Sequence, residues 1–93
     1  MNVVFLPPSD QEFLDAIAFY ELQLEGLGQV FTKEFFSTLE FIREFPNGWQ
    51  KIGRNTHKCP LRKFPYLILY VVEKNQIVVT ATAHQHRRPA SYL

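Results

Sequence analysis

Residues 66–84, YLILYVVEKNQIVVTATAH, hold the clearest structural signal in the chain. Tyr66–Glu73 is an almost continuous apolar run, which is typical of a central strand covered on both faces. Lys74 and Asn75 suit a two-residue turn. Gln76–His84 then returns as a second strand. The sequence therefore predicts a β-hairpin at the centre of an antiparallel sheet.

The two faces of the second strand differ in character. Side chains alternate along a strand, so one face carries Ile77, Val79, Ala81 and Ala83, and the other carries Val78, Thr80, Thr82 and His84. We expect the first face to pack on helices, and the second to look toward solvent or a ligand.

The chain before this hairpin predicts a first helix. Ser9 and Glu12 have the spacing of a capping box at a helix N-terminus. Apolar residues at helical spacing follow as far as Leu24. Gly26 and Gly28 are expected to end this helix and to turn the chain toward a second one.

A second helix is predicted from an apolar stripe that stops before Pro46. The stripe consists of Phe31, Phe35, Leu39 and Ile42. Residues 2–6 read as a short strand, and residues 49–52 and 58–61 as weaker strands. The predicted order is β-α-α-β-β-β, an α+β fold with a helical hairpin packed on one face of a small, largely antiparallel sheet. The 93 residues fit one domain, residues 1–93.

The net charge of +1 conceals a polarised chain. Residues 1–45 hold eight acidic and two basic side chains, a net charge of −6, whereas residues 46–93 hold eight basic and one acidic, a net charge of +7. Such a surface can steer an anionic partner to one side. The single cysteine, Cys59, favours a reducing compartment. Without a recognisable signal peptide or an apolar run long enough to span a bilayer, we expect a cytoplasmic protein with no membrane association.

Basic and aromatic residues gather in the last third of the chain. They are Lys58, Arg62, Lys63, His84, His86, Arg87, Arg88 and Tyr92. Arginine donates two hydrogen bonds to phosphate, histidine transfers protons near neutral pH, and tyrosine stacks on bases or donates a proton. RNA cleavage through attack of a 2′-hydroxyl needs such groups. Phosphate-loop, nucleophile-elbow and HExxH motifs are missing, and no cofactor is expected.

Simpler interpretations stay open for the same residues. A basic segment after a strand is often only solvated surface, and His84 could bond a backbone carbonyl at the strand end. Two histidines and one distant cysteine fall short of a closed metal site, so no metal is predicted. The segment FPY, residues 64–66, is either a binding wedge or a turn that seats two rings in the core.

The order of elements and several short motifs resemble the RelE/ParE toxin superfamily. The motifs are AIAFYELQLEGLGQVF across the helical hairpin, FPY before the central strand, Tyr70 within it, and AH..RRP..Y at the end. The resemblance runs from about Phe5 to Tyr92. Members are toxins of bacterial type II toxin–antitoxin modules, also described as plasmid stabilisation proteins, so the resemblance implies a cognate antitoxin as partner.

The resemblance implies one of two targets. Some relatives cut messenger RNA on the ribosome, and others inhibit DNA gyrase without chemistry. The basic cluster and the resemblance together give His84, His86, Arg87 and Tyr92 as catalytic candidates, and Lys58, Arg62, Lys63 and Arg88 as target-binding candidates. Nuclease relatives carry arginine where this chain has Leu67. That difference favours a gyrase inhibitor, or a degenerate relative that only binds an antitoxin or another protein.

Overall fold

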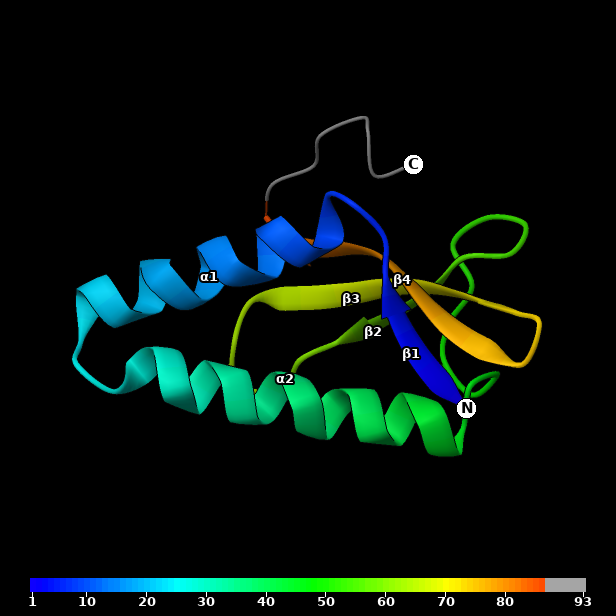
Figure 1. Cartoon of the computed structure of the whole chain (residues 1–93), viewed down its shortest axis with the longest axis horizontal. Coiled ribbons are helices and arrows are strands. Elements are labelled where there is room, and N and C mark those ends of the chain that lie inside the picture. Colours follow the sequence, from blue (N-terminus) through cyan, green and yellow to red (C-terminus); the bar gives the residue numbers. More distant parts are fainter. Residues whose placement is uncertain (87–93) are drawn as a thin grey trace.

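The computed structural model describes residues 1–86. The elements follow the order β1 (Asn2–Phe5), α1 (Ser9–Gln23), α2 (Leu27–Glu44), β2 (His57–Pro60), β3 (Tyr66–Glu73) and β4 (Gln76–His84). The two helices form a hairpin across one face of a four-stranded sheet (Figure 1). The α+β fold predicted from the sequence is therefore confirmed.

The predicted β-hairpin forms the centre of the sheet. The strand order is β1-β4-β3-β2, with β3 antiparallel to both of its neighbours and β1 parallel to β4. Lys74 and Asn75 have φ angles of 51° and 61°, so both central turn residues adopt the left-handed conformation of a type I′ hairpin. Residues 49–52 contribute only an isolated bridge between Lys51 and His57.

The link between the helices is fixed by one carboxylate and two glycines. Gly26 has a φ of +88°, a conformation that favours glycine. The carboxylate of Glu21 accepts the N–H groups of Gly26 and Gly28, each at 3.0 Å. A Cβ atom at Gly28 would lie 2.9 Å from the carbonyl oxygen of Ile17, so the two helices approach closely here. The predicted turn is confirmed. Within residues 1–86, neither helix combines the length and apolar character that a bilayer crossing requires.

The core between helices and sheet is mostly aromatic. Phe31 and Phe35 are fully buried on α2, and the ring of Phe35 lies 4.2 Å from that of Phe13 on α1. From the sheet, Tyr70 is also fully buried and donates its hydroxyl to the carbonyl of Pro46 at 2.7 Å. The predicted apolar stripe of α2 therefore faces the sheet.

The predicted capping box does not form. Pro8 occupies the N-cap position without a side-chain hydrogen bond. Ser9 instead donates its hydroxyl to the carbonyls of Leu6 and Val79, and a carboxylate oxygen of Glu12 accepts the N–H of Thr82 at 2.9 Å. Both side chains therefore bind the backbone of β4, Ser9 where the pairing with β1 ends and Glu12 beyond it. Sequence spacing could not distinguish this use from a local cap.

Glu12 is expected to contribute measurably to stability because Thr82, whose N–H it accepts, is only 2% exposed. In Glu12→Ala that N–H loses its acceptor, and an unsatisfied buried donor costs about 1–3 kcal/mol. Glu12→Gln keeps a carbonyl acceptor and should lose less. Urea unfolding measures the free energies, and amide exchange at Thr82 reports the bond directly. Equal stability of Glu12→Ala and the parent would contradict this role.

The expected faces of β4 are correct only for its first half. Leu69 pairs with Ala81, but the next residue, Tyr70, pairs with Val79, so Thr80 is the extra residue of a β-bulge. Beyond the bulge the alternation is reversed. Thr82 and His84 share the helix-covered face with Ile68 and Tyr66, while Ala81 and Ala83 lie on the opposite face. The expectation that His84 faces away from the helices is wrong.

Candidate functional site

The loop between β2 and β3 lies beside the end of β4. The N–H of Gln85 donates to the carbonyl of Pro65 at 2.8 Å. The loop itself is closed by the N–H of Leu61, which donates to the carbonyl of Tyr66 at 2.9 Å. Two of the predicted binding residues, Arg62 and Lys63, therefore lie at the same end of the sheet as His84.

The loop between β2 and β3, residues 61–65, is fixed by contacts with the aromatic core and with α2. The ring of Phe64 is buried, with its centre 4.8 Å from that of Tyr20 and 5.1 Å from that of Phe31. The N–H of Lys63 donates to a carboxylate oxygen of Glu34 on α2 at 2.8 Å. With its backbone fixed, the loop presents the side chains of Arg62 and Lys63 to solvent. The FPY segment is thus a turn that seats rings in the core.

The two catalytic-candidate histidines within the described residues contact each other. Their ring centres are 5.5 Å apart, and the ring of His84 also packs edge-on against Tyr66 at 5.2 Å. The backbone N–H of His86 donates to Nδ1 of His84 at 3.1 Å. Because Nδ1 accepts this bond, neutral His84 carries its proton on Nε2. In that form Nε2–H of His84 can donate a hydrogen bond, for example to a phosphate oxygen.

Lys58 does not join this group. It pairs with Leu69, so its side chain lies on the face of the sheet opposite to the helices, whereas His84 lies on the helix-covered face. Arg62, Lys63, His84 and His86 form what we call the basic end of the molecule. Arg87, Arg88 and Tyr92 lie outside the described residues.

The helix-free face of the sheet is mostly apolar over the described residues. Leu67, Leu69, Val78, Ala81 and Ala83 belong to it. Lys58 is the one cation that β2, β3 and β4 place there, and it lies on the edge strand β2. Of the catalytic candidates, His84 lies on the other, helix-covered face.

The remaining histidine and the cysteine are part of the core. His57 is 4% exposed, stacks on Tyr70 with ring centres 5.0 Å apart, and bonds the carbonyl of Trp49 through Nδ1 at 2.9 Å. Burial raises the pKa of the Cys59 thiol to about 11, so it stays protonated at neutral pH and is a poor nucleophile. Burial also raises the pKa of the Tyr70 hydroxyl, and the nearby Cys59 thiol, once ionised, raises it further.

Sequence reasoning missed Glu34. This residue lies on α2 and positions the basic loop, but 29 positions separate it from Lys63. In the sequence it is one of several acidic residues between apolar positions of a helix. Within residues 1–86, no three histidine, cysteine or carboxylate side chains lie close enough together to hold a metal ion.

Comparison with known proteins supports the architecture. No protein-family model matches the sequence, and no curated protein matches it. Among solved structures, a chain of the chromosomal ParDE TA system from P. aeruginosa superimposes with a TM-score of 0.73 and 13% sequence identity. The match covers 90% of this chain and 95% of the other. At this identity the likeness concerns the fold alone, and the fold of this chain is the one expected of the RelE/ParE toxin superfamily.

Proposed function

We propose that this chain is the toxin of a type II toxin–antitoxin pair and arrests growth by acting on translation or on DNA gyrase. The fold likeness to a ParDE system supports the class of protein. The observation that carries the proposal is the basic end, where the hydrogen bond between Gln85 and Pro65 brings a cationic loop beside two histidines.

One branch of the proposal is an RNA-cleaving enzyme. Arg62 and Lys63 would hold phosphates through charge-assisted hydrogen bonds, and His84, in its doubly protonated form, would protonate the leaving oxygen from Nε2 and become neutral. His86 would serve as the second proton carrier. Arg87, Arg88 and Tyr92, carried over from the resemblance, would complete the site. The contact between the rings of His84 and His86 beside the cationic loop supports this branch.

The second branch is a binding inhibitor of gyrase that performs no chemistry. Leu67 and its neighbours favour it, because they make the helix-free face of the sheet apolar where nuclease relatives carry arginine. A third possibility from the same residues is a degenerate relative that retains only the binding of an antitoxin or other protein.

Induced expression separates these branches, with cell growth, RNA integrity and plasmid supercoiling followed together. Arrest with cleaved RNA indicates the enzyme, arrest with relaxed plasmid indicates the inhibitor, and unimpaired growth indicates the degenerate relative.

The antitoxin is expected to place acidic residues on the basic end and on Arg87 and Arg88, which follow it in the sequence. Opposite potentials speed encounter and fix orientation, so Arg62→Glu, Arg87→Glu and Arg88→Glu combined should weaken antitoxin binding more than about tenfold, or about 1.4 kcal/mol. A control with the same change in net charge is Lys51→Glu, Arg54→Glu and Lys74→Glu, three exposed residues outside the basic end. Calorimetric titration of purified antitoxin measures both. Equal affinity of the two triple variants would mean that the basic end does not bind the antitoxin.

A further inference from the structure

The helix-free face of the sheet holds a patch of side chains that is almost fully buried. We call it the covered patch, and it consists of Leu69 on β3 and Val78, Ala81 and Ala83 on β4, each no more than 5% exposed. Leu67, on the same face of β3, is only half-buried. Apolar residues on both faces are typical of a sheet that is covered on both sides. Neighbouring strands shield a side chain only from the sides, so burial of this degree requires a segment above the patch.

The cover is not a helix or a strand of residues 1–86. Both helices lie on the opposite face (Figure 1), and the short link from β1 leads into α1 on that side. Gln50 accepts the N–H of Lys58, so the chain before β2 runs beside that strand rather than over the face. The loop of residues 61–65 is anchored on the helix side by the ring of Phe64. The patch is nevertheless buried within a single chain, and the segment that remains is residues 87–93.

Residue 87 follows directly from the end of the covered patch. Ala83 precedes His84, the last residue of β4, and Gln85 and His86 then form a turn in which the N–H of His86 donates to Nδ1 of His84. From Ala83 back to Val78 the strand spans about 17 Å. Residues 87–93 reach about 23 Å when extended. This segment is therefore long enough to run back over the whole patch.

The composition of residues 87–93 suits an apolar face. The sequence RRPASYL begins with two arginines that follow the basic end and continues with the apolar or aromatic residues Pro89, Ala90, Tyr92 and Leu93. Proline and alanine lose no side-chain rotamer freedom on burial. A tyrosine ring buries a large apolar area while its hydroxyl can still reach water. Ala81 is small, so it leaves room above β4 for such a ring.

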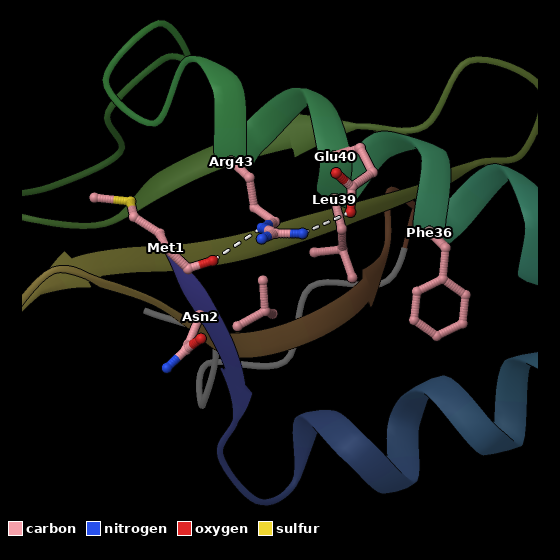
Figure 2. A pocket seen from close by; sticks show the side chains of 7 residues that line it. Met1, Asn2, Phe36, Leu39, Glu40 and Arg43 are labelled. Carbon is pink, nitrogen blue, oxygen red and sulfur yellow. Dashed lines mark hydrogen bonds and ion pairs between the residues drawn. The ribbon is translucent and has the colours of Figure 1, made fainter.

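A pocket lined by apolar side chains is a poorer place for this segment. It has a volume of about 310 Å³, lies between the start of β1 and α2, and includes Phe36 in its lining (Figure 2). Arg43 at its rim is already bonded to the carbonyl of Met1 and to Glu40, each at 2.9 Å (Figure 2). The start of β1 pairs with the start of β4, about 25 Å along that strand from His84. The pocket is therefore at the limit of the reach of residues 87–93, and on the other side of the sheet.

We propose that residues 87–93 fold back over the helix-free face and cover this patch, with the ring of Tyr92 above Ala81 and Leu69. The cover itself does not depend on the proposed toxin function, whereas its consequence rests on that function. A target that binds the apolar face around Leu67 must first displace the segment. In the RNA-cleaving branch, Tyr92 joins the histidines only after the same release, because His84 lies on the helix-covered face. The segment therefore restrains either activity until it is displaced.

Nuclear Overhauser effects between the Tyr92 ring and the methyl groups of the covered patch test this placement on the full chain. We expect these contacts in the parent at concentrations where it is monomeric. Tyr92→Ser combined with Leu93→Ser should shift the methyl signals of the patch and increase binding of the dye ANS, which reports exposed apolar surface. The matched control is Leu22→Ser combined with Leu24→Ser, because these two side chains are 89% and 63% exposed. The control should leave the patch signals and the dye binding unchanged.

Absence of these contacts in the parent would overturn the proposal, and so would a Tyr92 and Leu93 variant with the patch signals and dye binding of the parent. Contacts that appear only as the protein concentration rises would assign the cover to a second copy, which also overturns it. If the double variant does not fold, the contacts in the parent still decide.

The restraining role has its own readout in the binding-inhibitor branch. There the Tyr92 and Leu93 variant should block supercoiling at a lower protein concentration than the parent, and equal potency would overturn that role. The contacts of the cover are independent of growth arrest. A chain that shows them but leaves growth unimpaired keeps its cover, whereas the proposed toxin function fails.

Discussion

Phe35→Ala is expected to remove a large part of the stability of this domain. The ring is fully buried, and its centre lies 4.2 Å from that of Phe13 and 6.1 Å from that of Phe5. It therefore joins α1, α2 and β1. Truncating a buried phenylalanine costs about 3–5 kcal/mol, because the apolar packing of the ring disappears and the surroundings close the cavity only in part. Small domains are stable by only about 5–15 kcal/mol.

The measurement is urea unfolding followed by circular dichroism, with Phe41→Ala as control. Phe41 lies on the same helix, but it is 46% exposed. The control removes the same side chain and changes helix propensity in the same way, so the difference between the two variants isolates burial. We expect Phe41→Ala to cost no more than about 1 kcal/mol, the usual range for surface substitutions. Equal destabilisation of the two variants would mean that the aromatic cluster does not hold the hairpin on the sheet.

The parts of the fold that could be predicted depend on local signals. The turn at Lys74 and Asn75, the stripe around Phe35 and the glycines between the helices each act through residues close in sequence. Each also acts in the structure as the sequence indicated. Such signals fix element order, and the packing rules for a helical hairpin on a sheet then leave few topologies.

The features that could not be predicted depend on contacts between distant residues. The bulge at Thr80 reverses which side chains of β4 face the helices, although residues 76–84 alternate regularly. Ser9 and Glu12 match a capping motif but bond β4, at sequence separations of up to 70 residues. Strand register and pairing at the sheet edge determine the bulge and these hydrogen bonds. Neither can be predicted from the spacing of apolar and polar residues within one segment.

The candidate site was predictable in composition but not in arrangement. The sequence indicates a group of cations and histidines. It does not indicate that Lys58 lies on the other face of the sheet from His84, or that Glu34 fixes the loop of Lys63. Likewise, His57 looks like any other histidine in the sequence, and only burial against Tyr70 identifies it as a core residue.

Replacing His84 should reduce RNA cleavage by about 10²–10⁴-fold if the chain is a ribonuclease, the usual contribution of a general acid or base. His84→Gln is the informative variant because glutamine is polar and of similar size but cannot transfer a proton. Single-turnover cleavage on ribosomes measures the chemical step, and the melting temperature and antitoxin affinity check that the fold is intact. His86→Ala, tested alongside, shows which of the two contacting histidines transfers the proton.

The binding step is tested separately through its salt dependence. Replacing Arg62 and Lys63 by alanine should flatten the plot of log affinity for single-stranded RNA against log salt, by a slope of roughly 0.7 for each phosphate that the protein no longer neutralises. His84→Gln removes neither of these two cations, so it should leave that slope unchanged. The opposite outcome would contradict the enzyme branch. If arrested cells keep intact RNA while the protein blocks supercoiling in both histidine variants, the basic end is a docking surface. The chain is then a binding inhibitor that performs no chemistry. The apolar face around Leu67 is consistent with such an inhibitor.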